Sequence, residues 1–174
     1  MTDPYHAESL AQGGRYLSSG LLADYRRSPR LAWQRLVRAY SPPDSDARLI
    51  GRALHCYALE GPTVFAERYD ISGGPVNERT GAPFGAATQA FAAWAEGIRL
   101  RGLEPLTLKQ AAVVAELAAS LHGHAVIGPM IRDAQPEQIC RATVEGVECQ
   151  CRADGVLDGT LLELKTCDAL DRFE

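Results

Sequence analysis

The sequence predicts an α/β protein with a helical N-terminal half and a small mixed central sheet flanked by helices. Two observations predict it: apolar residues recur at helical spacing along the first half, and after Pro136 they alternate with polar residues as in strands. The chain has 174 residues, of which 46% are apolar and 23% are charged. This length and composition are typical of one folded domain, so residues 1–174 are predicted to form a single domain.

Helix starts and ends are marked by capping residues, proline and glycine. Ser18 and Ser19 are N-cap types, Ser28-Pro29 joins a cap to a first-turn proline, and Gly61-Pro62 is a stop signal. Thr107 caps one of the later helices. With the apolar spacing, these signals predict helices over residues 20–25, 30–40, 44–60, 84–100, 108–121 and 125–132. The polar, Gly- and Pro-rich stretch over 73–83 predicts a mobile loop.

The strands follow these helices, apart from a short one predicted over 69–71. Alternation predicts strands over 138–144, 147–157 and 160–166. Asp158-Gly159 is the preferred dipeptide of a type I′ hairpin turn. In such a hairpin, residues whose numbers sum to 317 face each other, so Asp154 is predicted opposite Glu163 and Arg152 opposite Lys165. The other face then holds Cys151, Ala153, Leu162 and Leu164, as expected of a buried side.

Two carboxylates directly opposite in a strand pair repel each other, with Cβ atoms roughly 5 Å apart. A divalent cation offsets that repulsion, and carboxylate oxygens at this spacing suit Mg²⁺ or Mn²⁺. Lys165 lies two residues beyond Glu163 on the same face, where its ammonium group is placed to neutralise charge on a phosphate. The alternative is a solvated face of ion pairs, and the residues alone favour neither.

The five cysteines indicate a reducing compartment, because their number is odd and no signal peptide precedes them. Four lie near the C-terminal end, but their spacing lacks the C-x2-C element of ordinary zinc sites. Buried structural thiols are therefore favoured over a cysteine metal site. No apolar run approaches the ~18 residues of a membrane span, so a cytoplasmic protein without a membrane partner is expected.

The net charge of −4 shows no global basic field of the kind that many nucleic-acid-binding proteins carry. Positive charge is concentrated locally between Tyr25 and Tyr40, where Arg26, Arg27 and Arg30 precede Trp33. These arginines are candidate phosphate contacts, with a solvated helical face as the alternative. Arg79 in the predicted loop and Arg152 on the carboxylate face are further candidates for DNA binding.

The motif formed by Asp154 and Glu163-Leu164-Lys165 resembles the pattern of the PD-(D/E)XK nuclease superfamily. Further segments resemble, in the same order, the exonuclease VIII (RecE) C-terminal nuclease family. The similar segments are Tyr5-His6-Ala7, residues 17–21, Ser28-Pro29, residues 51–55, Leu59-Glu60, residues 65–69, residues 77–80, residues 146–154, Glu163-Leu164-Lys165-Thr166 and Phe173. Together they cover the chain from residue 5 nearly to its end.

This resemblance implies a restriction-endonuclease-like fold and metal-dependent hydrolysis of DNA phosphodiesters. It implies Mg²⁺ or Mn²⁺ held by His55, Asp154, Glu163 and the backbone carbonyl of Leu164. Lys165, Glu163 and Asp154 would be the catalytic residues. Glu137 lies where the family often has a glutamate. Members of the family are 5′→3′ exonucleases on double-stranded ends in phage-type recombination, so the resemblance also implies a ring-like homo-oligomer and a single-strand annealing protein as partner.

The sequence departs from the family pattern at three places. Gln150 stands where lysine is common, and residues 80–83 lack the usual Gly-Lys. The family also continues into a helix carrying Gln-x-x-x-Tyr, which this sequence lacks, so the domain is expected to be C-terminally truncated. Besides an active nuclease, a catalytically incomplete nuclease-fold module that acts in DNA binding or assembly is therefore kept as an alternative. A metal protein built on the cysteine cluster is a third.

Overall fold

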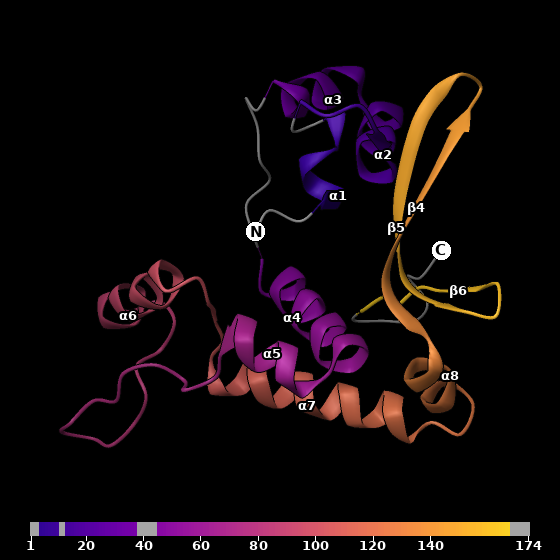
Figure 1. The fold of residues 1–174 in the computed structure, drawn as a ribbon. Helices are drawn as coiled ribbons and strands as arrows, with labels where there is room; N and C mark the ends of the chain where they lie inside the picture. Colours follow the sequence, from indigo (N-terminus) through magenta and orange to yellow (C-terminus); the bar gives the residue numbers. More distant parts are fainter. Residues whose placement is uncertain (1–3, 11–12, 38–44, 168–174) are drawn as a thin grey trace. The chain divides into compact units, whose positions relative to one another are not determined.

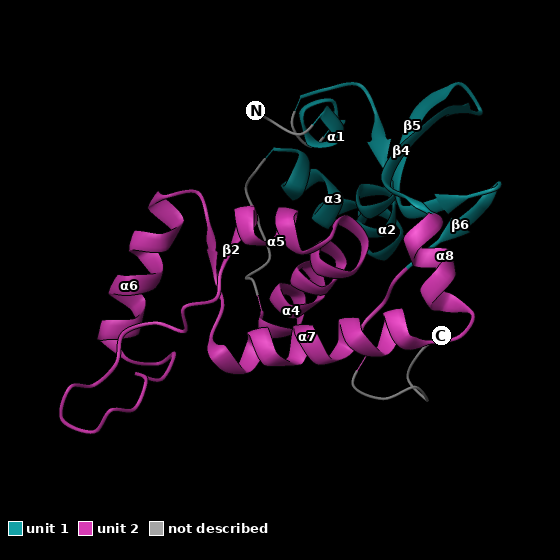
Figure 2. Ribbon diagram, turned by 60° about the horizontal axis from the view of Figure 1, so that its bottom comes forward, with its two compact units in different colours: residues 1–44, 134–163 teal, residues 45–133, 164–174 magenta. Residues whose placement is uncertain are grey.

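The computed structural model describes residues 4–10, 13–37 and 45–167. The chain forms two compact units, each assembled from two stretches of sequence (Figure 2). Unit 1 comprises residues 1–44 and 134–163, and unit 2 comprises residues 45–133 and 164–174. The predicted α/β class with a small mixed sheet is confirmed. A single domain over residues 1–174 stays a prediction.

Unit 1 joins short N-terminal helices to the sheet. Its elements are α1 (Pro4–Ala7), β1 (Leu17–Ser18), α2 (Ser19–Arg27), α3 (Pro29–Leu36), β4 (Gln135–Val144), β5 (Val147–Leu157) and β6 (Thr160–Leu162). The predicted caps of the helices are confirmed: the side chain of Ser18 accepts a hydrogen bond from the Leu21 N–H, and that of Ser28 from the Leu31 N–H. The helix predicted to reach Tyr40 ends at Leu36, and residues 38–44 lie outside the described part.

The sheet of unit 1 is mixed. β4 and β5 form a long antiparallel hairpin (Figure 1), β6 pairs antiparallel with β5 along part of its length, and β1 pairs parallel with β5. The parallel pair, Leu17 with Cys149 and Ser18 with Gln150, was not predicted. Two predicted bounds are wrong, since β4 starts at Gln135 and β6 ends at Leu162.

Unit 2 is largely helical. Its elements are α4 (Asp46–His55), the π-helix η2 (Cys56–Glu60), α5 (Pro62–Arg68), β2 (Tyr69–Asp70), α6 (Gln89–Leu100), β3 (Glu104–Pro105), α7 (Leu108–Gly123) and α8 (Ile127–Asp133). Thr107 and Gln110 form a reciprocal capping box at the start of α7, which confirms the predicted cap. The helix predicted from residue 84 starts at Gln89 instead, because Thr88 is its N-cap.

Gly61-Pro62 ends η2, as predicted, but it also starts α5, which sequence analysis missed. Pro62 occupies the first turn of α5, where its lack of an N–H group costs nothing. The short strand β2 confirms the prediction over 69–71, and it pairs parallel with the unpredicted β3. The predicted loop closes on itself, since the Asn77 N–H donates to the Ala82 carbonyl over 2.8 Å.

The core of unit 2 lies where α4, η2, α5 and α7 meet. Ala53, Cys56 and Phe65 pack there with Leu106 and Val114, all buried. A second cluster, Leu54 with Ala58 and Ala118, continues this core along α4 and α7. The two clusters fix the position of the C-terminal end of α4, which carries His55.

Truncation of the largest fully buried side chain tests this core. Leu106→Ala is expected to lower the free energy of unfolding by about 2–5 kcal/mol, because Leu106 has no exposed surface and its loss leaves a cavity. The measurement is urea unfolding followed by circular dichroism. Leu100→Ala is the matched control, since Leu100 is 81% exposed, and its effect is expected to stay within about 0.5 kcal/mol. Equal effects of the two changes would contradict the assignment of the core.

No single helix in the described ranges combines the length and the apolar character needed to cross a membrane. By length and composition alone, α7 and α8 pass that test together, as a pair bent by 99°.

Candidate functional site

The hairpin that carries the predicted carboxylates folds as its turn dictates. Asp158 and Gly159 have φ values of 47° and 78°, which is the left-handed pair that a type I′ turn requires. The ladder pairs Leu157 with Thr160, Val156 with Leu161 and Gly155 with Leu162. The predicted register, in which paired numbers sum to 317, is therefore confirmed for these pairs.

The predicted pairing beyond them is wrong, because the ladder stops at Gly155 and Leu162. Asp154 and Glu163 are the next residues on the two chains, and neither they nor Arg152 and Lys165 form ladder pairs. Glu163 directly follows β6, whereas Asp154 lies in β5, whose other edge pairs with β4.

Asp154 instead faces a carboxylate that the hairpin argument did not use. The β4–β5 register pairs Pro136 with Gly155 and Gln138 with Ala153, which places Glu137 opposite Asp154. A carboxylate oxygen of Glu137 lies within 4.8 Å of one of Asp154. Two hard oxygen donors at this spacing fit Mg²⁺ or Mn²⁺.

Glu137 has an unusual backbone conformation, and its side chain forms an ion pair. Its φ of 53° lies in the left-handed region, which is uncommon for a residue other than glycine. Its Oε2 lies 2.8 Å from Nε of Arg152. The Arg152 guanidinium also stands 5.1 Å from the centre of the Tyr5 ring. The ion pair balances the charge of Glu137 and orients its side chain.

Gln150 lies two residues before Arg152, where the resembled family often has lysine. It is 3% exposed, and its Nε2 donates to the backbone carbonyl of Tyr5 over 2.7 Å. Gln150 and Arg152 thus both connect β5 to Tyr5 of α1, Gln150 through a hydrogen bond and Arg152 through its contact with the ring. A charged ammonium group at this buried position would have to be desolvated, which the neutral amide avoids.

In unit 2, the Leu164–Thr166 segment runs along α4. Leu164 packs against the cluster of Leu54, Ala58 and Ala118. A Cβ added to Gly51 would meet Oγ1 of Thr166 at 3.4 Å. His55 lies one helical turn after Gly51 and so shares its face of α4. The segment with the predicted ligand Leu164 and the catalytic Lys165 therefore follows the helix that bears His55.

The structure divides the predicted site residues between the units. Asp154, Glu163 and Arg152 belong to unit 1, and His55, Leu164, Lys165 and Arg79 belong to unit 2. Lys165 and Glu163 are exposed, and His55 and Asp154 are half-buried. The chain crosses from one unit to the other within the Glu163-Leu164-Lys165 motif itself.

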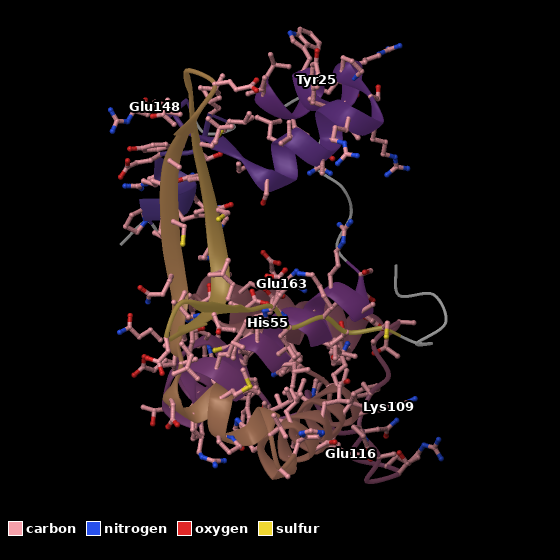
Figure 3. All side chains as sticks on the ribbon, turned by 90° about the vertical axis from the view of Figure 1, so that its right-hand side faces the viewer. Tyr25, His55, Lys109, Glu116, Glu148 and Glu163 are labelled. Carbon is pink, nitrogen blue, oxygen red and sulfur yellow. The ribbon has the colours of Figure 1, made fainter. Side chains whose placement is uncertain are left out.

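The predicted basic patch lies on α2 and α3 (Figure 3, around Tyr25). Arg26, Arg27 and Arg30 are exposed, and Trp33 is 60% exposed. Arg35 pairs with Asp24 over 2.7 Å and is thereby engaged within the helix pair. The exposed arginines, and Arg79 in its loop, keep their role as predicted phosphate contacts.

The expectation of buried thiols is correct for Cys56 and wrong for Cys151 and Cys167, which are exposed. Burial raises the pKa of Cys56 to about 11, so this thiol stays protonated. Among the described residues, no three cysteines bring their sulfur atoms within 4.8 Å of one another, as a compact thiolate metal site would require.

The chain has no significant match among protein-family models, curated proteins or solved structures. Its function is therefore proposed from its sequence motifs and from the geometry within each unit.

Glu137 is the residue whose pairing sequence analysis missed, although a signal for it was present. Glu145-Gly146 separates Val144 from Val147, and both residues have positive φ values, as in the Asp158-Gly159 turn. With a two-residue turn at this place, the numbers of facing residues in β4 and β5 sum to 291, so residue 137 faces residue 154.

Proposed function

We propose that this protein is a metal-dependent deoxyribonuclease that hydrolyses DNA phosphodiester bonds. The observation that carries the proposal is the pair of facing carboxylates, Glu137 and Asp154, on a strand whose next hairpin leads to Glu163 and Lys165. Facing carboxylates repel each other, and the Arg152 ion pair offsets part of that repulsion at Glu137. Two hard oxygen donors at this spacing also favour Mg²⁺ or Mn²⁺, which would neutralise both carboxylates.

In the proposed site, Asp154 and Glu137 hold the cation, and Glu163 and the Leu164 carbonyl join them as the sequence motif implies. His55 is proposed as a further ligand on the strength of the resemblance and of the Leu164–Thr166 segment along α4. When bound, the cation supplies Lewis-acid activation and charge neutralisation at the phosphate. Lys165 stabilises the negative charge that develops on the phosphate oxygens.

The substrate is proposed to be double-stranded DNA ends, degraded 5′→3′ in phage-type recombination. The exposed Arg26, Arg27 and Arg30 on α2 and α3 would contact the DNA backbone, and Arg79 would do so from its loop. Arg152 is proposed to act through Glu137, with which it forms the ion pair. A homo-oligomer around DNA and a single-strand annealing protein complete the proposal, following the resemblance.

The decisive experiment compares one plasmid in two forms. Purified protein is incubated with linearised and with closed-circular duplex DNA, in Mg²⁺, in Mn²⁺ and in EDTA. We expect the linear form to be degraded from its ends in either metal, and the circular form and all EDTA samples to remain intact. End-labelling of each strand separately then reports the direction of digestion.

Intact linear DNA in both metals would contradict the proposed activity for this chain. If that protein still retards DNA in a gel, the alternative of a non-catalytic DNA-binding module replaces the nuclease. Cleavage of both plasmid forms at equal rates would instead indicate an endonuclease and overturn the preference for ends.

A further inference from the structure

The face of the β4–β5 hairpin opposite the carboxylates carries three thiols. Cys140 is directly paired with Cys151 across the strands, and Cys149 pairs with Ala142. Because side chains alternate along a strand, these cysteines share one face, while Gln150, Arg152 and Asp154 lie on the other. The thiols and the pair Glu137–Asp154 therefore lie on opposite faces of the same two strands.

The thiols line an open groove within unit 1. The groove has a volume of about 360 Å³ and is lined by residues of β1, α2, β4 and β5, most of its exposed surface being apolar, with Ser18, Ser19, Arg141 and Gln150 among the lining residues. Leu17 and Leu22 contribute the apolar part beside Cys140, Cys149 and Cys151. Cys151 is exposed, so a small thiol reagent in solvent reaches it directly.

Of the three cysteine pairs, Cys140 and Cys151 are the pair that lies directly opposite across the two strands, and so the pair nearest to the Cβ separation of roughly 3.5–4.5 Å that a disulfide needs. Directly opposed residues in an antiparallel pair have Cβ atoms about 4.5–5.5 Å apart, whereas diagonal neighbours such as Cys140 and Cys149 are about 7–8 Å apart. Cys149 and Cys151 are next-but-one neighbours on an extended strand, where consecutive residues advance about 3.3 Å each. Burial raises the pKa of Cys151, and the charge of Cys140, the hydrogen bond to it and the charge of Glu163 raise this pKa further, so oxidation should be faster at alkaline pH, where more of the thiol is ionised.

We propose that Cys140 and Cys151 form a redox modification site that a low-molecular-weight disulfide, such as oxidised glutathione, converts to a cross-strand disulfide. The Cys151 thiolate attacks the glutathione disulfide, which forms a mixed disulfide and releases one glutathione thiolate. The Cys140 thiolate then attacks the Cys151 sulfur, which forms the protein disulfide and releases the second glutathione. Two protein thiols are oxidised and one glutathione disulfide is reduced to two thiols. This inference does not depend on the proposed nuclease activity.

The test oxidises the native full-length chain with glutathione disulfide, traps the remaining thiols by alkylation and maps tryptic peptides. Trypsin separates Cys140, in peptide 133–141, from Cys149 and Cys151, in peptide 142–152. We expect one linked pair of these peptides, a mass loss of about 2 Da for the two hydrogens removed, and alkylated Cys56 and Cys167.

Matched variants identify the partner on β5. Cys149→Ser is expected to keep the link at the wild-type yield, and Cys151→Ser to reduce it by roughly 10-fold or more. In Cys140→Ser, the mixed disulfide with glutathione should persist on Cys151. The proposal is overturned if peptides 133–141 and 142–152 stay unlinked in the wild type, or if Cys149→Ser abolishes the link and Cys151→Ser does not.

Discussion

Replacement of Lys165 by alanine is expected to lower the rate of Mg²⁺-dependent cleavage of linear duplex DNA by about 10²–10³-fold. This is the usual effect of removing one group that stabilises developing negative charge on a reacting oxygen. Lys165 is exposed and lies in the segment that follows α4, next to Leu164, which packs in the unit 2 core. Its ammonium group is therefore accessible to a phosphate, while its backbone is held by its neighbours.

The measurement is the initial rate of loss of an end-labelled duplex at saturating Mg²⁺. Lys109→Ala is the control, because Lys109 is also exposed but lies on α7 (Figure 3), remote in sequence from the motif. It should cleave at the wild-type rate. Circular dichroism and the unfolding midpoint of both variants should match the wild type, since neither side chain is buried. A Lys165→Ala protein that cleaves as fast as Lys109→Ala would remove Lys165 from the proposed chemistry.

The parts of the fold that sequence predicted well are those set by nearest neighbours in the chain. Each of three predicted caps, Ser18, Ser28 and Thr107, lies directly before a helix. Its side-chain oxygen accepts a hydrogen bond from an N–H group that the helix leaves unpaired. Asp158-Gly159 fixes the β5–β6 register for the same local reason, since its two positive φ values allow only one tight turn.

What sequence could not predict depends on partners distant in the chain. β1 has two residues, and only its parallel pairing with Cys149 and Gln150 makes it a strand. The same holds for β2 and β3, which pair across more than thirty residues. The signal at Pro62 was ambiguous in itself, because proline both ends one helix and suits the first turn of the next.

The candidate site shows the same division between local and distant causes. The hairpin arithmetic gave the correct β5–β6 register for the pairs from Leu157–Thr160 to Gly155–Leu162, but it extended the ladder too far. β6 ends at Leu162, and Leu164 packs instead with the unit 2 cluster of Leu54, Ala58 and Ala118. On the other edge of β5, β4 pairs with the strand, and this pairing places Glu137 opposite Asp154.

Asp154→Asn is expected to have the largest effect of the carboxylate changes, because every proposed set of metal ligands includes Asp154. It faces Glu137 across β4–β5 and directly precedes Gly155, which forms the last β5–β6 ladder pair with Leu162. The change removes one negative charge with almost no change of shape. We expect cleavage to fall by about 10³-fold, which corresponds to the several kcal/mol that a bound cation contributes. Affinity for Mn²⁺, measured by titration calorimetry, should fall by at least about 10-fold.

Comparison with Glu137→Gln and Glu163→Gln identifies which second carboxylate holds the cation. If the cation lies between Glu137 and Asp154, Glu137→Gln should weaken Mn²⁺ binding nearly as much as Asp154→Asn. Glu163→Gln should then lower cleavage more than it lowers binding. Glu116→Gln, on the exposed side of α7, is the charge-matched control and should change neither quantity. Wild-type Mn²⁺ affinity in Asp154→Asn would contradict the site, because every proposed arrangement of ligands includes this carboxylate.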